Sequence, residues 1–184
     1  MPQSAAALSP FPPIAEYAFL SNCHTGALVA PDGAVDWLCV PRFDSPSVFG
    51  TLLDRQCGSF RFGPFGINVP SARVYEPGTN VLLTTWKTPT GWLLVRDALT
   101  IGRREGDDHV TPHTRPPADD DAEHMLVRVA TCLEDDVEIE LNCEPVFDYG
   151  RETATWTLAA DRHSAEAAGA GASLTLHTLS LIHI

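Results

Sequence analysis

Short apolar stretches separated by glycine- and proline-containing turns run along the chain, and two pairs of them have the pattern of β-hairpins. Residues 26–40 predict two strands joined at Pro31-Asp32-Gly33, because proline fixes φ and glycine accepts a positive φ. Residues 80–99 repeat the pattern around a turn at residues 89–91, with threonine, valine and tryptophan favouring strands on both sides. The chain therefore predicts antiparallel strands connected by short turns.

Further strands are predicted at residues 59–65, 124–132 and 137–143, and weaker ones at 153–159 and 173–179. In residues 137–143 every second side chain is apolar, which predicts a half-buried strand with one solvated face; the inward positions are Val137, Ile139 and Leu141. No long stretch has helical periodicity. The fold expected is all-β, an antiparallel β-sandwich of two packed sheets.

The remaining segments are predicted to lie outside the sheets. Residues 1–13 are small and proline-rich and are expected to be disordered, so the domain extends over residues 14–178. Residues 102–122, which contain Asp119-Asp120-Asp121, are expected to form a long surface loop. The alanine- and glycine-rich residues 165–172 are expected to form a flexible linker.

The net charge and the cysteine content limit which binding partners and which cellular compartment are expected for the protein. The net charge of −12 disfavours nucleic acid and anionic membrane surfaces, whereas a neutral sugar is compatible with it. Five cysteines without a CxxC pair favour free thiols over a disulfide framework or a zinc site. The N-terminus has no basic segment followed by an apolar core, and no apolar run reaches transmembrane length, so a cytoplasmic location is expected.

The common catalytic and cofactor motifs are missing from the sequence. There is no GxSxG nucleophile elbow and no phosphate-binding GxxxxGK[ST] loop. His109 and His113 are four residues apart, but Pro112 disfavours the helix that would place them on one face, so no metal site is expected. Inverting glycoside hydrolysis needs a pair of carboxylates, and nothing in the spacing of the 24 acidic residues selects one.

The most distinctive segment is residues 36–46, where a strand ends at a proline. It contains Trp37, Arg42, Phe43 and Asp44, side chains that can stack on sugar rings or bind hydroxyl groups. The competing interpretation is a structural corner, in which Arg42 pairs with a neighbour and Asp44 caps the next element. Both interpretations stay open from the residues alone.

At the level of motifs the chain resembles bacterial trehalase-like enzymes of glycoside hydrolase family 15. The resemblance begins with residues 14–53, IAEYAFLSNCHTGALVAPDGAVDWLCVPRFDSPSVFGTLL, and continues through shorter blocks at residues 75–80, 90–99, 122–128 and 143–149. Glu16 and Asn22 depart from the family pattern, and the change at Asn22 weakens a charge-based role there. The resemblance implies a supersandwich-type N-terminal domain that packs on a separate (α/α)6 barrel carrying both catalytic glutamates.

The resemblance also implies what this chain lacks. The motif that opens the barrel is not in the sequence, so no catalytic residue is assigned to this chain, which is expected to be inactive alone and to have its own missing catalytic domain as partner. The parent is expected to hydrolyse α,α-trehalose with inversion, and phosphate and magnesium are cofactors implied only for that parent. Trp37, Arg42, Phe43 and Asp44 are then candidates for the domain interface or pocket rim. Residues 179–184 depart from the family pattern and are expected to be a non-native tail.

Two alternatives remain beside the trehalase assignment. One is a glucoamylase-like hydrolase of α-glucans. The other is a stand-alone carbohydrate-binding β-sandwich, which would display a row of exposed aromatic side chains. The four tryptophans, Trp37, Trp86, Trp92 and Trp156, could form such a row or belong to the core, and their positions in the fold distinguish the two.

Overall fold

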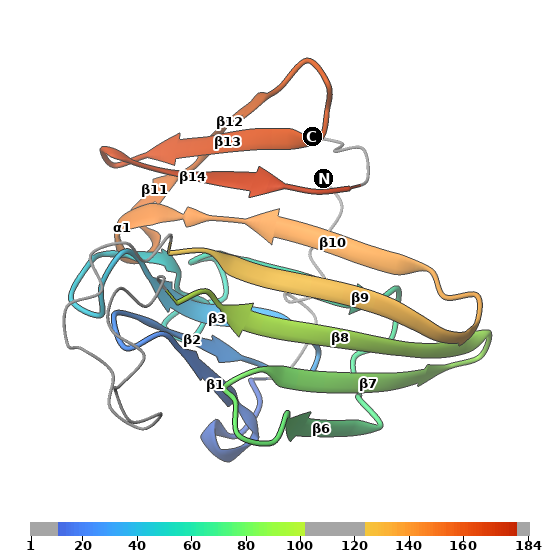
Figure 1. The fold of residues 1–184 in the computed structure, drawn as a ribbon. Coiled ribbons are helices and arrows are strands. Elements are labelled where there is room, and N and C mark those ends of the chain that lie inside the picture. Colours follow the sequence, from blue (N-terminus) through green and yellow to red (C-terminus); the bar gives the residue numbers. More distant parts are fainter. Residues whose placement is uncertain (1–10, 102–123, 180–184) are drawn as a thin grey trace, which may run out of the picture.

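A computed structural model describes residues 11–101 and 124–179, and these residues form three antiparallel sheets. Figure 1 shows the arrangement, with a larger sheet behind, a second sheet in front and a small third sheet above them. The elements are η2 (Ile14–Glu16), β1 (Ala18–Ser21), β2 (Gly26–Val29), β3 (Ala34–Cys39), β4 (Ser47–Phe49), β5 (Ser59–Pro64), β6 (Ala72–Tyr75), β7 (Leu82–Thr88), β8 (Gly91–Leu99), β9 (Leu126–Asp135), β10 (Ile139–Glu144), α1 (Phe147–Gly150), β11 (Glu152–Thr153), β12 (Thr155–Leu158), β13 (Ser164–Gly169) and β14 (Ala172–His177).

The all-β antiparallel prediction is confirmed, as are both predicted hairpins. The rear sheet has the order β1-β2-β3-β5-β10, with β4 paired to β3, and the front sheet has the order β6-β7-β8-β9. In the β2–β3 turn, Gly33 has φ 83°, and the Asp32 carboxylate accepts a hydrogen bond from the Ala34 amide at 3.0 Å. This is the glycine conformation that the proline-glycine turn predicted.

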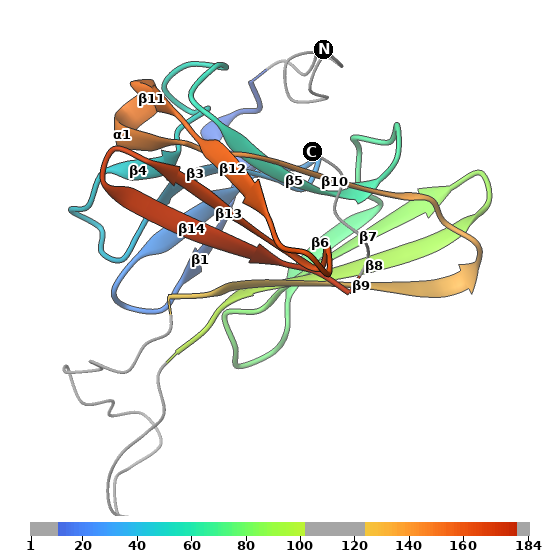
Figure 2. The ribbon, with the colours of Figure 1, turned by 90° about the horizontal axis from the view of Figure 1, so that it is seen from above.

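The core lies between the two larger sheets, which Figure 2 shows as two layers. Every second residue of β8 is buried, so one face of the front sheet lines the core. A buried ion pair joins the layers: Arg128 on β9 binds Asp97 on β8 at 2.8 Å and also donates to the carbonyls of Phe60 (2.7 Å) and Gly33 (2.6 Å) in the rear sheet. Arg128 thereby acts as a polar bridge between the two layers.

The third sheet, β12-β13-β14, differs from two expectations: that the domain has only two sheets, and that residues 165–172 form a flexible linker. The chain turns away from the rear sheet at α1 and forms this additional sheet instead of extending either of the other two. Of residues 165–172, expected to form a flexible linker, 165–169 belong to β13, the central strand of the sheet, with Ala165 and Ala167 buried, and 170–171 form the turn to β14. The small residues serve close packing, since a Cβ at Gly169 would lie 2.8 Å from the Phe147 ring.

In β10, apolar and polar side chains alternate between the two faces of the strand, as predicted, but the apolar side chains are not buried as predicted. Ile139 and Leu141 lie opposite Pro64 and Phe62 of β5, yet they are 41% and 40% exposed. Glu140, on the other face, is the partner of the buried Arg61 at 2.5 Å. The apolar side chains are exposed because β10 is the last strand of its sheet, which the local pattern could not show.

Several expectations concern segments outside the described residues. These are most of the segment expected to be disordered (residues 1–10), the loop at 102–122 with His109, His113 and the Asp119–121 run, and residues 180–184 of the expected tail. Of the residues that are described, Phe11 has the Arg55 guanidinium 4.9 Å from its ring centroid. Within residues 11–101 and 124–179, no helix has the length and apolar character needed to cross a membrane.

Candidate functional site

A row of three large side chains crosses the outer face of the rear sheet. The strand register places Phe19 of β1 opposite Leu28 of β2, and Leu28 opposite Trp37 of β3. Their sequence neighbours Ala18, Leu20, Ala27 and Val29 are buried in the core. Because side chains alternate between the faces of a strand, Phe19, Leu28 and Trp37 point away from the core.

Gly26 makes room for a further aromatic ring, that of Phe43, beside this row. A Cβ at Gly26 would collide with the Phe19 ring and lie 3.1 Å from the Phe43 ring, so both rings lie over the bare backbone. The Phe43 amide donates to the His24 carbonyl at 2.9 Å, which holds the turn after β3 against the β1–β2 turn. Phe43 therefore extends the row toward the end of the sheet.

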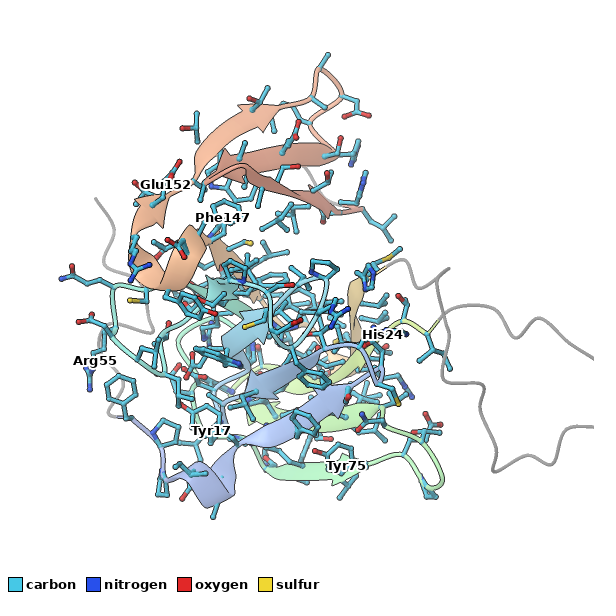
Figure 3. All side chains as sticks on the ribbon, turned by 90° about the vertical axis from the view of Figure 1, so that its left-hand side faces the viewer. Tyr17, His24, Arg55, Tyr75, Phe147 and Glu152 are labelled. Carbon is cyan, nitrogen blue, oxygen red and sulfur yellow. The ribbon has the colours of Figure 1, made fainter. Side chains whose placement is uncertain are left out.

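Tyr149 completes the surface from a distant part of the sequence. Its ring centroid lies 6.3 Å from that of Trp37, and its hydroxyl donates to the Ser45 carbonyl at 3.4 Å. Asp148 and Tyr149 both have left-handed φ values, 50° and 58°, and this turn presents the ring to Trp37. Figure 3 views the molecule from the end at which α1, marked by Phe147, and the turn of His24 lie.

These side chains form one surface, which we call the aromatic face: Phe19, Leu28, Trp37, Phe43 and Tyr149. Phe19, Phe43 and Tyr149 are 48%, 57% and 40% exposed, and Leu28 and Trp37 are half-buried. Tyr75 of β6, labelled in Figure 3, fixes β1 below this face because its hydroxyl binds both the amide (2.8 Å) and the carbonyl (3.0 Å) of Phe19. A cluster of exposed rings on a rigid sheet is typical of an interaction surface.

Arg42 and Asp44 form a two-pronged ion pair in the turn that carries Phe43. The distances are 2.9 Å from Nε to Oδ1 and 3.3 Å from Nη2 to Oδ2, and both side chains are exposed. The hydrogen bond and charge of Arg42 lower the pKa of Asp44. Exposed ion pairs add little to the stability of a fold. The pair places two charged groups that can form hydrogen bonds at the border of the aromatic face.

Beside the aromatic face, Asp36 is a buried carboxyl group. Its Oδ2 accepts the Tyr17 hydroxyl at 2.8 Å, while Oδ1 is buried without a hydrogen-bond partner. Burial raises the pKa of Asp36 to about 6, an effect that the Tyr17 hydrogen bond reduces and the charge of Asp32 increases. The burial of the Tyr17 hydroxyl raises the pKa of Tyr17, and the hydrogen bond to Asp36 and the charge of Asp36 raise it further.

Asn22 is a structural residue in the neighbouring turn. It is buried, and its Oδ1 accepts the amides of His24 (3.0 Å) and Thr25 (2.9 Å). Its Nδ2 donates to the Thr100 carbonyl at 3.1 Å, which links the rear sheet to the end of β8. An aspartate at this position could not donate that hydrogen bond.

The structure brings together the four residues singled out from the sequence and adds others. Trp37 and Phe43 belong to the aromatic face, and Arg42 and Asp44 lie beside it. The structural-corner interpretation expected Arg42 to pair with a neighbour and Asp44 to cap the next element. In the structure, the partner of Arg42 is Asp44. Sequence reasoning missed Phe19 and Leu28, whose outward direction depends on register, and missed that Tyr149 meets Trp37.

The four tryptophans do not form a row. Trp86 is fully buried in the core. Trp37, Trp92 and Trp156 are half-buried and lie in three different sheets, on β3, β8 and β12. The arrangement gives no support to a stand-alone binding module built on tryptophans.

No cluster of metal-binding side chains is found in the part of the chain that the structure describes. Residues 11–101 and 124–179 hold no group of three or more histidine, cysteine, aspartate or glutamate side chains arranged to bind a metal ion. Among the same residues, the one carboxyl whose pKa rises to about 6, Asp36, is closed off from solvent.

Comparison with known proteins gives consistent similarities. Residues 9–115 match the family described as "Trehalase-like, N-terminal". The chain is 51% identical over 170 residues to a trehalase of Mycobacterium tuberculosis, covering 92% of this chain and 25% of that protein. It is 56% identical over 149 residues to a trehalase of Mycolicibacterium smegmatis, covering 80% and 22%. No solved structure shows significant similarity to it.

The relatives are much longer than this chain. The chain spans about a quarter of the length of these two mycobacterial trehalases. A more distant similarity, 42% over 86 residues, is to "Trehalase 1" of Sulfolobus acidocaldarius. The matched part therefore corresponds to one segment of a larger protein in those relatives.

Proposed function

Since the chain belongs to the family of trehalase-like N-terminal domains, we propose that it is the non-catalytic first part of an α,α-trehalase of glycoside hydrolase family 15. The parent would hydrolyse trehalose to two glucose molecules with inversion, using two carboxylates of a catalytic domain outside this chain. The observation that carries the proposal is the 51% identity to a trehalase over 92% of the chain.

In this proposal the aromatic face is the contact to the catalytic domain. Its rings come from the segments that carry the family resemblance, residues 14–53 and 143–149, and those segments meet at one end of the rear sheet. Exposed rings lose their contact with water when a partner covers them, which favours docking by roughly 25 cal/mol per Å² of apolar surface. Arg42 and Asp44, at the border, would shape the rim of a pocket for a neutral sugar.

Location and cofactors follow from the same proposal. A cytoplasmic enzyme fits the five free cysteines of the chain. We propose that any phosphate or magnesium dependence of the parent belongs to its catalytic domain. The partners proposed are that catalytic domain and a neutral sugar, with no nucleic acid and no membrane surface.

Activity measurements test the assignment directly. We expect this 184-residue chain to release no glucose from trehalose, because no pair of catalytic carboxylates is assigned to it. Fusing the chain to the remaining three quarters of the M. tuberculosis trehalase should give a chimera that does release glucose from trehalose. Inhibitor-sensitive turnover by the chain alone would contradict the non-catalytic role, and a folded chimera that cleaves maltose but not trehalose would favour the α-glucan alternative.

A variant of the aromatic face tests the docking role. Phe43→Asp in the same chimera should lower trehalose turnover at least tenfold, because a charge would replace an exposed ring at the proposed contact. The matched control is Ile14→Asp, an exposed apolar residue of η2 outside that face. Circular dichroism of both variants checks the fold, and equal turnover of the two would show that the aromatic face does not contact the catalytic domain.

A further inference from the structure

The block at residues 75–80, which carries part of the family resemblance, lies outside the aromatic face but contacts the strand that carries Phe19. β1 is the first strand of the rear sheet, and among the described residues it pairs with β2 alone. In an antiparallel pair, alternate residues of such a strand direct their amide and carbonyl groups away from the partner strand. Phe19 and Ser21 are two residues of β1 whose backbone groups bind side chains of the front sheet.

Tyr75 holds the backbone of Phe19 through a single hydroxyl group. The hydroxyl oxygen accepts a hydrogen bond from the Phe19 amide at 2.8 Å, and the hydroxyl donates one to the Phe19 carbonyl at 3.0 Å. One side chain of β6 thus satisfies both backbone groups of that residue. Because the contact is made to the backbone, it leaves the Phe19 ring on the outer face of the rear sheet, over Gly26.

Two further side chains bind the same region of the rear sheet on either side of this contact. The Asn80 side-chain amide donates to the Ser21 carbonyl at 2.9 Å, at the end of β1. The Arg73 guanidinium donates to the carbonyls of Glu16 at 2.6 Å and Val29 at 2.8 Å, at the start of β1. The front sheet therefore holds β1 along its whole length by bonds to backbone groups.

The turn between β6 and β7 places Asn80 for its contact. The Glu76 amide donates to the Val81 carbonyl at 2.9 Å, which closes the turn. Gly78 has φ 76°, a left-handed value that glycine adopts without a steric cost. Since this turn follows Tyr75 directly, the Tyr75 hydroxyl and the Asn80 amide reach β1 from one hydrogen-bonded support.

The position of Phe19 depends on how β1 is held, because the strand is short and lies at the border of its sheet. β1 has four residues, and Ala18 and Leu20 fix its inner face in the core. On the outer face the Phe19 ring is 48% exposed. Strands at a sheet border open more readily than central ones, so contacts to their backbone affect the placement of such a ring.

We propose that Tyr75 and Asn80 are positioning residues for the contact between the aromatic face and the catalytic domain. They hold the backbone of β1 so that the Phe19 ring lies where that domain docks, and neither needs to touch the domain itself. The inference rests on the proposed function, because it concerns the same contact. It gives the block at residues 75–80 a role that the aromatic face alone does not explain.

Amide hydrogen exchange of the 184-residue chain, followed by NMR, tests whether Tyr75 holds β1. Tyr75→Phe removes the hydroxyl and keeps the ring, so the Phe19 amide should exchange at least about tenfold faster than in the parent chain. The matched control is Thr88→Val, because the Thr88 hydroxyl also donates to a carbonyl (Gly91, 3.0 Å) and accepts from an amide (Thr90, 3.2 Å), but in the β7–β8 turn. The control should leave the Phe19 amide unchanged. Equal exchange of this amide in the parent chain and in Tyr75→Phe would overturn the inference.

Trehalose turnover by the chimera described above tests whether Tyr75 acts through Phe19. Tyr75→Phe should lower turnover at least about threefold, the effect of one or two lost hydrogen bonds. In a chimera that already carries Phe19→Ala, the same change should have no further effect, because the ring that Tyr75 positions is gone. A general loss of stability would instead lower turnover by the same factor in both backgrounds. Thr88→Val should leave turnover unchanged.

The outcomes separate this inference from the proposed function. If an active chimera loses turnover equally on Tyr75→Phe with and without Phe19, or loses none on Phe19→Ala, the inference is wrong and the trehalase assignment stands. If Tyr75→Phe does not fold, Asn80→Ala, which removes only the bond to Ser21, takes its place in the same cycle with the same expectation. A folded parent chimera that releases no glucose would contradict the proposed function, and the inference with it.

Discussion

Replacing Arg128 by methionine should lower the free energy of unfolding by about 3–5 kcal/mol, the cost of leaving one partner of a buried ion pair alone. Arg128 and Asp97 are 3% and 1% exposed, so the Asp97 carboxyl group would be left in the core without its partner. The carbonyls of Phe60 and Gly33 would also lose their donor. Each of these losses acts at the junction of the two large sheets.

Urea unfolding followed by tryptophan fluorescence measures the effect. The matched control is Arg151→Met, which breaks the exposed Arg151–Asp148 pair and should change the stability by less than about 1 kcal/mol. The double variant Arg128→Met with Asp97→Leu should recover part of the loss, because it removes the uncompensated charge. A single-variant loss below about 1 kcal/mol would mean that Arg128 does not hold the layers together.

Replacing Asp36 by asparagine should make the protein progressively more stable than the parent chain as the pH rises. The pKa of Asp36 is raised from 3.8 to about 6 in the folded protein, so ionising it opposes folding. The stability that this raised pKa provides is complete below pH 3.8 and is lost as the pH rises through 6. A shift of about two pKa units corresponds to about 3 kcal/mol in all, and about 2.5 kcal/mol of it should develop as a stability difference between variant and parent from pH 4 to pH 8.

The comparison between the two pH values isolates the charge. Asparagine keeps an oxygen for the Tyr17 hydroxyl, and any cost of burying its amide group is the same at both pH values and cancels. Tyr17→Phe is the informative companion, since removing the hydrogen bond that lowers the pKa of Asp36 should make the stability of that variant more pH-dependent. Equal stability differences at pH 4 and pH 8 would show that Asp36 does not titrate in this range.

Local pattern in the sequence was sufficient for the strands and turns whose signals lie within a few residues. The β2–β3 and β7–β8 hairpins formed where turn residues separated strand-forming ones, and the alternation in β10 is present as predicted. Pattern failed at β13, because alanine and glycine carry no strand signal of their own. β13 pairs with both β12 and β14, its side chains Ala165 and Ala167 are buried, and Gly169 leaves room for the Phe147 ring.

Sequence by itself determined the all-β class, the two hairpins and the family, because turn chemistry, alternation and motifs are properties of neighbouring residues. Only the tertiary structure decided which faces are covered. It placed Tyr149 beside Trp37, more than a hundred residues apart along the chain, and left Leu141 exposed on a face that points into the sandwich. The reason is that a strand specifies two faces by its period, whereas burial depends on which distant strand packs against each face.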